Sequence, residues 1–330
     1  MDTDVAALQA ALAGLCQREM MALRRPDEFG GPALAEADFR AFQLEVARYS
    51  GALAFLQTQH QSAVSMIAKN GHRALQERVL PLMANGDLLM GIGFSQLRRA
   101  GPPILRAAPV EGGYVVNGEL PWLTGLGFFH EVLVGASLPD GRALFFATPF
   151  ASRTELQLSE PMRLAAMEAA QTVSGVATDL FVPEAEVAFI QAPEWIHRND
   201  LVNVTLQGFF ALGCARGALD QVEKAVPKKG IAVATAAEQL IAEWEACLND
   251  LANPPADFEE KLKTRAWAIE LCGRCAQAAI AAVGGSSIVL THPAQRIARE
   301  AAVYAVSAQT PAIMEATLAR ITARTGTFGT

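Results

Sequence analysis

The sequence predicts an α+β protein in which a β-rich centre is flanked by helices. Between residues 87 and 150, apolar and polar residues alternate in short runs, as they do in half-buried β-strands. Turn-forming pairs interrupt these runs at Gly112-Gly113, Asn117-Gly118 and Asp140-Gly141. Such pairs tolerate the positive φ angles of tight hairpins, so we expect a meander of antiparallel strands. Long patterns with helical spacing lie before and after this region.

These patterns divide the chain into three expected domains. Residues 1–86 are expected to form an N-terminal helical domain, residues 87–192 a central antiparallel β domain, and residues 193–330 a C-terminal four-helix bundle. The helices expected in the first domain cover residues 4–20, 33–48, 51–68 and 72–83. Those expected in the bundle cover residues 200–225, 231–252, 256–283 and 293–323. Turns rich in Gly and Pro separate them, and such short connections are typical of an up-and-down bundle.

Composition and charge argue against several classes of function. The 330 residues include 27 basic and 34 acidic side chains, which gives a formal charge of −7. This acidic balance argues against nucleic acid or an anionic membrane surface as a partner. No segment reaches the ~18 uninterrupted apolar residues that a membrane span needs, and the first residues are acidic where a secretory signal would be basic. We therefore expect a cytoplasmic protein.

The cysteines indicate a structural role. Their number is five, which is odd, and most are scattered through helical patterns. Cys272 and Cys275 form a single CxxC pair, but neither a second pair nor histidines at ligand spacing accompany it. Since a structural zinc site needs four ligands, we expect these thiols to pack in the core and we predict no metal site.

A motif within the β-rich region is specific enough to indicate a family. Gly113, Tyr114, Asn117 and Gly118 are followed by Trp122-Leu123-Thr124-Gly125. The order and spacing of these residues resemble the acyl-CoA dehydrogenase superfamily, which also has helices, a β meander and helices in this order. The resemblance implies that family's fold with a shortened N-terminal helical domain, a bound flavin (FAD, with FMN as the alternative), a small-molecule substrate such as an acyl-CoA, and a homodimer or homotetramer.

The resemblance also implies which residues bind the flavin. Trp122 would supply an aromatic surface, Thr124 a hydroxyl near the flavin ring, and Ser95 a second hydroxyl from the preceding segment. Gly284 and Gly285 match a G-G turn that approaches the adenosine part across a subunit contact. Each has a plainer interpretation: Trp122 and Thr124 as ordinary strand residues, and the glycines as a helix–helix turn. Two neighbouring arginines, Arg98 and Arg99, either bind a phosphate or lie at a solvated strand end.

The residues expected to remove a proton from the substrate are missing. In the family that base is a glutamate, and the matching position, counted from the R-D-A-like Arg299-Glu300-Ala301, is Ala308. The alternative base position on the first bundle helix falls near Asn203. Neither side chain can accept a proton at neutral pH. Asp200 and Glu315 are the nearest carboxylates in the sequence, and either would otherwise be a solvated helix charge.

The sequence leaves three functions open. The first is an acyl-CoA dehydrogenase-like flavoenzyme that oxidises a CH–CH bond of an acyl thioester. The second is a two-component flavin monooxygenase, a branch of the same superfamily whose W-x-T-G, L-P-D-G and H-P-x-Q-R motifs are matched at Trp122, Leu138 and His292. Ser307 stands where that branch usually has a histidine near the flavin. The third is a non-catalytic member that binds flavin, acyl thioester or a protein partner.

Overall fold

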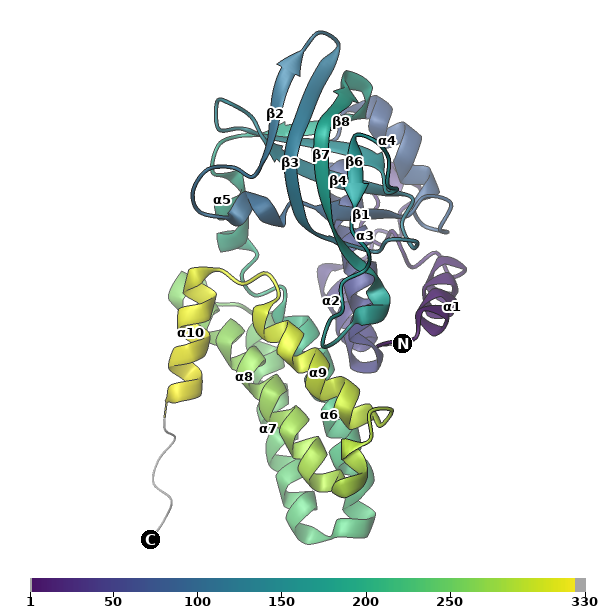
Figure 1. Ribbon diagram of the computed structural model, residues 1–330. Helices are drawn as coiled ribbons and strands as arrows, with labels where there is room; N and C mark the ends of the chain where they lie inside the picture. The colour runs from purple at the N-terminus through teal and green to yellow at the C-terminus, as the bar shows by residue number, and fades with distance from the viewer. Residues whose placement is uncertain (1, 324–330) are drawn as a thin grey trace.

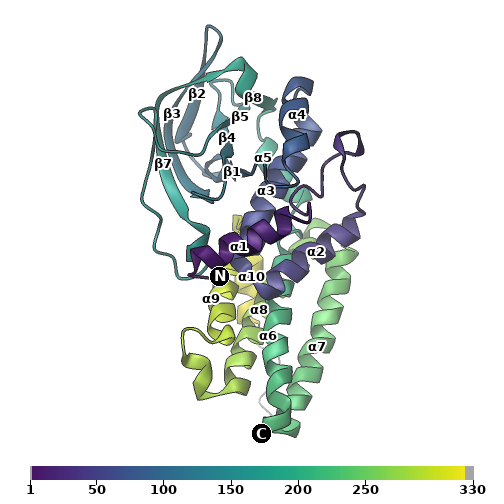
Figure 2. The same cartoon turned by 90° about the vertical axis from the view of Figure 1, so that its right-hand side faces the viewer.

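The computed structural model describes residues 2–323 and contains the three expected parts in the expected order (Figure 1). The N-terminal part consists of helices α1 (Val5–Cys16), α2 (Glu36–Tyr49), α3 (Gly51–Asn70) and α4 (Arg73–Val79). Asp4 caps α1 and Ser50 caps α3, because their side-chain oxygens accept hydrogen bonds from backbone amides of the first helical turn. α2 packs against the bundle and α3 against the sheet, so these helices join the other two parts (Figure 2).

The central part is one mixed sheet with the strand order β6-β7-β3-β2-β4-β5-β8, in which β1 also pairs with β4. Its strands are β1 (Met90–Gly93), β2 (Leu105–Val110), β3 (Gly113–Thr124), β4 (Glu131–Ser137), β5 (Ala143–Pro149), β6 (Leu156–Leu158), β7 (Thr172–Pro183) and β8 (Val187–Gln191). The expected antiparallel pairing holds for β2–β3 and β4–β5. It does not hold for the pairs β1–β4 and β2–β4, which are parallel.

The turn-forming pairs do not all make turns. Gly112 (φ +77°) lies in the β2–β3 hairpin and Gly141 (φ +83°) in the β4–β5 hairpin, as expected. Asn117-Gly118 instead lies inside β3, where the pairing with β7 shifts register. A Cβ on Gly118 would lie 1.9 Å from the carbonyl oxygen of Ile104. The expected turn is wrong here, because the same residue pair also suits a β-bulge at which two backbones come close.

The C-terminal part is a bundle of α6 (Gly208–Lys229), α7 (Ile231–Ala252), α8 (Phe258–Val283) and α9 (Pro293–Val306). The short helix α5 (Trp195–Val202) precedes the bundle, and α10 (Pro311–Thr322) packs against α8. The single helix expected over residues 293–323 is therefore wrong: it is split at 307–310. Pro311 disfavours a helical conformation of the residue before it, and Thr310 caps α10 by accepting a hydrogen bond from the Ile313 amide.

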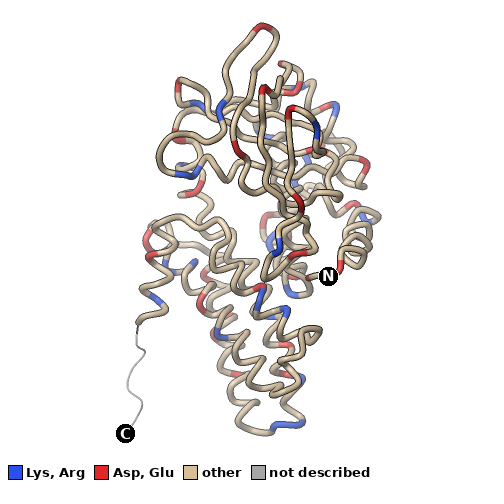
Figure 3. The backbone as a smooth tube through the Cα atoms, in the orientation of Figure 1, with Lys and Arg blue, Asp and Glu red and all other residues tan. Residues whose placement is uncertain are grey.

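α8 is the core helix of the bundle. Within residues 2–323 it is the one helix that is long and apolar enough to cross a membrane by length and composition, and 50% of its most apolar window is buried. It contacts α6, α7, α9 and α10, which explains why its surface is apolar on several sides. Cys272 and Cys275 lie on this helix and are fully buried. Basic and acidic residues are interspersed over both sheet and bundle (Figure 3).

His60 on α3 connects the N-terminal helices to the sheet. Its ring is fully buried, and Nδ1 accepts a hydrogen bond of 2.9 Å from the Met90 amide. Nε2 lies 2.9 Å from the Met83 carbonyl oxygen and donates to it. These partners select the neutral tautomer with its proton on Nε2. Burial lowers the pKa of His60 to about 4, because the charged ring would lose its hydration.

Acidification is expected to destabilise the protein through His60. The pKa falls from 6.5 in the unfolded chain to about 4 in the folded one, so the unfolded chain binds the proton first. Stability is therefore complete above about pH 6.5 and is lost down to about pH 4, by about 3 kcal/mol for a shift of this size. The measurement is the free energy of unfolding in urea against pH for the wild type and for His60→Gln. The same slope in both proteins contradicts this role, and His197→Gln on exposed α5 is the control.

The three parts of the chain meet at Glu300 of α9, which is fully buried. One carboxylate oxygen accepts a 2.9 Å hydrogen bond from the Gly51 amide at the start of α3, and the other accepts one of 2.5 Å from Arg296. A Cβ on Gly51 would lie 2.6 Å from Cε of Met167 and 2.8 Å from Cδ of Glu300. Glycine at this position therefore lets the helix start approach both the sheet loop and the bundle.

Asp2 makes a second connection between the same parts. Its side chain accepts a hydrogen bond from the Met167 amide, in the loop that leads to β7, and pairs with Arg299 of α9. Its carbonyl oxygen accepts a further hydrogen bond, of 2.9 Å, from the Ala169 amide. The N-terminal segment is thereby fixed between sheet and bundle.

Candidate functional site

The residues expected to face a flavin lie at the end of β3. Trp122 is 53% exposed, and it sits where the pairing of β3 with β7 shifts register. Thr124, two residues later, is buried, and its hydroxyl shares a 3.0 Å hydrogen bond with the hydroxyl of Thr172. Gly125 follows with φ +102°, and a Cβ there would lie 2.3 Å from the Phe129 ring. The strand end is therefore fixed while the indole of Trp122 remains accessible.

Ser95 lies on an adjacent element, a short 3-10 helix at Ser95–Arg98 that contacts β3 and β4. Gln96 anchors this element by donating hydrogen bonds to the carbonyl oxygens of Gly93 (3.0 Å) and Gly135 (2.7 Å). The hydroxyl oxygen of Ser95 is shielded from solvent and has no hydrogen-bond partner among the described residues 2–323. A buried hydroxyl without a partner is costly, so this position is suited to a polar atom of a ligand.

Arg98 and Asp200 form an ion pair that the sequence did not predict. Nε of Arg98 donates a 2.8 Å hydrogen bond to one carboxylate oxygen of Asp200 on α5, and Nη2 donates one of 2.8 Å to the other. Such a two-point pair holds both side chains in a defined geometry. Asp200 is therefore tied to a cation, and Arg98 is already paired. Arg99 is exposed.

The position expected for the catalytic glutamate lies in the turn between α9 and α10. Ala308 is exposed there and has a left-handed backbone with φ +48°. Ser307, just before it, shares a 3.2 Å hydrogen bond with Gln207 in the segment between α5 and α6. Asn203, at the end of α5, precedes Gln207 by one short segment of chain, and its side chain donates a hydrogen bond to the carbonyl oxygen of Asn199. The segments that carry the two neutral base positions therefore meet, and neither supplies a carboxylate.

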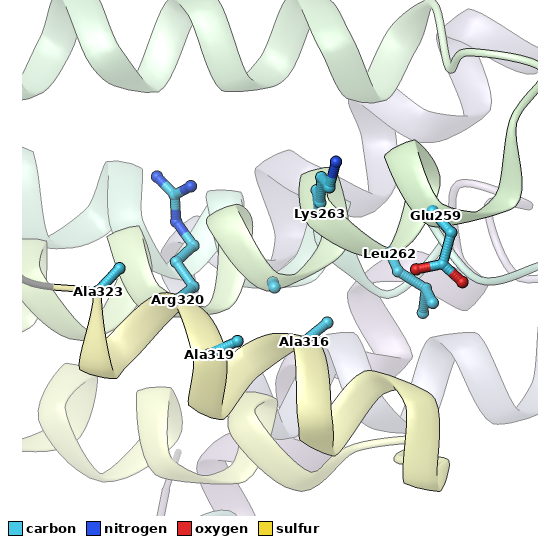
Figure 4. A pocket seen from close by; sticks show the side chains of 8 residues that line it. Glu259, Leu262, Lys263, Ala316, Ala319, Arg320 and Ala323 are labelled. Carbon is cyan, nitrogen blue, oxygen red and sulfur yellow. The ribbon is translucent and has the colours of Figure 1, made fainter.

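Glu315 is exposed on α10, two turns beyond Ala308. No ion pair of its carboxylate occurs within residues 2–323, and nothing directs it toward the turn. A groove of 370 Å³ runs nearby between α8 and α10 (Figure 4). None of the predicted site residues lines it. Its lining residues are Glu259, Leu262, Lys263, Ala266, Ala316, Ala319, Arg320 and Ala323.

Gly284 and Gly285 lie at the end of the bundle away from the sheet (Figure 1). Gly284 has φ +82° and ψ −155°, a conformation that is almost restricted to glycine. Lys229 Nζ is 3.6 Å from the place of a Gly284 Cβ, whereas a Cβ on Gly285 would meet no described atom within 4 Å. A single chain therefore does not bring these glycines to Trp122.

Sequence reasoning missed Arg265 on α8, which is fully buried. It donates a 3.1 Å hydrogen bond to the Ser307 carbonyl oxygen, next to Ala308. A signal for it existed. The inward positions of α8 recur at a spacing of three and four, and Arg265 occupies one of them between Leu262 and Ile269. An arginine at such a position is unusual, because arginine is almost never fully buried unless it is paired.

Comparisons with known proteins match both helical parts. A family model described as "Acyl-CoA dehydrogenase, N-terminal domain" matches residues 2–87, and one described as "Acyl-CoA dehydrogenase, C-terminal domain" matches residues 231–311. The mitochondrial 2-methylacyl-CoA dehydrogenase of Solanum tuberosum is 23% identical over 322 residues, covering 89% of this chain and 78% of that protein. The mitochondrial isovaleryl-CoA dehydrogenase of Arabidopsis thaliana is 29% identical over 123 residues, which are 36% of this chain and 30% of that protein.

Solved structures share the fold. Butyryl-CoA dehydrogenase from Megasphaera elsdenii superposes with a TM-score of 0.79 at 15% identity, covering 97% of this chain and 90% of that chain. An acyl-CoA dehydrogenase from Bacillus anthracis complexed with FAD superposes with a TM-score of 0.77 at 15% identity, covering 93% of this chain and 61% of that one. At these identities the likeness shows the fold alone.

Proposed function

Because this chain belongs to the acyl-CoA dehydrogenase superfamily, we propose that it is a flavin-dependent oxidoreductase that acts on an acyl thioester. The observation that carries the proposal is the pairing of an accessible Trp122 with the buried, unpartnered hydroxyl of Ser95 on neighbouring elements. An isoalloxazine ring needs both an aromatic surface and polar groups at its edge. FAD is the proposed cofactor, with FMN as the alternative.

The residues present fit such a ring. Ser95 offers a hydroxyl that nothing in residues 2–323 satisfies, and the Thr124 hydroxyl keeps bonding capacity beyond its contact with Thr172. Trp122 provides an apolar face at the strand end. When bound, the flavin supplies hydride transfer. The protein's own contribution is to orient the ring and to exclude water from one side of it.

The variants Trp122→Ala and Thr124→Ala are expected to weaken flavin retention, each by about tenfold or more in dissociation constant, because each removes one contact worth about 1.4 kcal/mol. The measurement is fluorescence titration of the apoprotein with FAD and with FMN, which also identifies the preferred cofactor. Phe181→Ala, an exposed aromatic elsewhere in the sheet, is the matched control. Full occupancy in both site variants contradicts this placement of the flavin.

A flavin-dependent monooxygenase that uses reduced flavin and dioxygen is the second candidate. It is supported by the absence of an available carboxylate in the described residues around the turn at Ala308. Asn203 is neutral, and Asp200 is held by Arg98. Removal of an acyl α-proton needs a base within hydrogen-bonding reach, whereas oxygen chemistry at the flavin does not need this carboxylate.

The visible absorption spectrum under anaerobic conditions separates these functions. The purified protein with bound flavin is titrated with a panel of acyl-CoAs. Bleaching by one of them supports the dehydrogenase. Bound flavin that no acyl-CoA bleaches, together with turnover when a flavin reductase is supplied, supports the monooxygenase. A protein that takes up no flavin contradicts both and leaves a non-catalytic binding role.

A homodimer or homotetramer is part of the proposal. Trp122 and the Gly284 turn lie far apart in one chain. They can therefore contact the same flavin only if they come from different subunits, which supports an oligomer. Large apolar side chains are exposed around that turn: Ile231, Ile288, Val289 and Leu290. Exposed apolar patches of this kind are typical of protein interfaces.

A further inference from the structure

Arg265 is a buried cation without a counter-ion. It is 0% exposed, and no carboxylate pairs with it among residues 2–323. Nη2 donates to the Ser307 carbonyl oxygen at 3.1 Å, but Nε and Nη1 are buried and have no partner in the described part of the chain. Two of the three guanidinium nitrogens are therefore removed from water without replacement.

The surroundings of Arg265 make this arrangement costly. Leu262 and Ile269 lie one turn away on either side, and both belong to a small apolar cluster with Val204 and Ile313. Loss of hydration lowers the pKa of Arg265 to about 9, so the guanidinium is still charged at neutral pH. A buried charge is normally paired, because an isolated one is strongly destabilising.

Arg265 lies beside the turn that carries Ala308. The Ser307 carbonyl that it contacts belongs to the residue immediately before Ala308, so Arg265 lies directly behind the α9–α10 turn. The α5–α6 segment also meets this turn, through Gln207. Ala308 supplies only a methyl group, so the turn contributes no negative charge that would balance the cation. An anion that binds at the turn would supply the missing negative charge.

We propose that Arg265 makes the 307–310 turn an anion-binding position and that the ligand of this site carries a carboxylate group. The inference rests on the proposed function, because it takes this turn as a wall of the flavin site. A guanidinium recognises both carboxylates and phosphates. A carboxylate brings one negative charge for one cation, whereas a phosphate dianion would bring a second, uncompensated charge to the apolar cluster. The ligand is therefore an acyl compound with a free carboxylate near the carbons that face the turn.

The test uses propionate as the probe, with propionamide as its neutral isostere, on the full chain reconstituted with FAD. Isothermal calorimetry and the flavin difference spectrum are both recorded. We expect propionate to bind at least tenfold more tightly than propionamide. Arg265→Gln should remove this preference and Arg265→Lys should retain it, because lysine keeps the charge. Inorganic phosphate is expected to bind at least tenfold more weakly than propionate.

A pair of substitutions at the exposed position 308 keeps the test valid if Arg265→Gln does not fold. Ala308→Glu places a carboxylate at the turn, so it should abolish propionate binding, while Ala308→Gln has the same size without charge and should retain it. Equal binding of propionate and propionamide by the wild type overturns the inference, as does phosphate binding equal to that of propionate. Failure to take up FAD contradicts the proposed function instead, and the two failures are therefore distinguishable.

Discussion

The variant Ala308→Glu is expected to bleach its bound flavin with an acyl-CoA about 10²- to 10⁴-fold faster than the wild type, which is the usual contribution of a well-placed general base. The substitution restores a carboxylate at the turn between α9 and α10, where the wild type has only an exposed methyl group. The uncompensated charge of Arg265 behind the turn favours the ionised form of a new carboxylate, which is the form that accepts a proton. The measurement is the anaerobic rate of flavin reduction in a stopped-flow experiment.

Ala308→Gln is the control for this gain of activity. Glutamine has the size of glutamate and a polar end but cannot act as a base at neutral pH. A gain in Ala308→Glu alone would identify the missing base as the factor that limits desaturation. Equal rates in the wild type and both variants would show that the turn does not face the reacting carbons, and would leave the monooxygenase as the better proposal.

Removal of the Glu300 side chain is expected to lower the free energy of unfolding by about 3–5 kcal/mol, the range for breaking one partner of a buried ion pair. In Glu300→Ala, the Gly51 amide loses its acceptor and Arg296 loses its counter-ion. Burial raises the pKa of Glu300 despite the opposing effect of Arg296. The measurement is urea unfolding at neutral pH.

Glu315→Ala is the matched control, because it makes the same substitution on an exposed helix face. Its effect is expected to stay within about 0.5 kcal/mol, as for most surface changes. A comparably small effect of Glu300→Ala would mean that the three parts of the chain do not depend on this contact. A comparable loss in Glu315→Ala would show that the effect does not come from the burial of Glu300, because alanine favours a helix at both positions.

The sequence carried enough information for the family and the order of the parts. The motif from Gly113 to Gly125 resembles the family in order and spacing, and that resemblance is confirmed by the family models that match residues 2–87 and 231–311. Predictions from local sequence patterns were less reliable where the same pattern suits two different backbone conformations. Asn117-Gly118 suits a bulge as well as a turn, and the helical pattern of residues 293–323 continues across the break at Pro311.

The site could be predicted only in part, because long-range pairing is not visible in one sequence. Asp200 was a candidate base by its position on a helix, but the structure joins it to Arg98, 102 residues earlier. The contact of Arg265 with Ser307 spans 42 residues and depends on how α8 packs against α9. Periodicity places a residue on a face of a helix, but it does not identify the partner on the other side. The roles of Trp122, Thr124, Ser95 and Gly284 stay predictions.

The buried contacts of Asp2 have a consequence for modularity. One side chain from the N-terminal part binds the Met167 amide in the sheet part and Arg299 in the bundle. A central part exchanged for that of a relative would have to reproduce the backbone at Met167, or it would leave one oxygen of the buried Asp2 carboxylate without its donor. Chimeras of family members that are joined at the boundaries between the three parts would therefore have mismatched contacts around Asp2. The three parts are expected to diverge together, as one inherited unit.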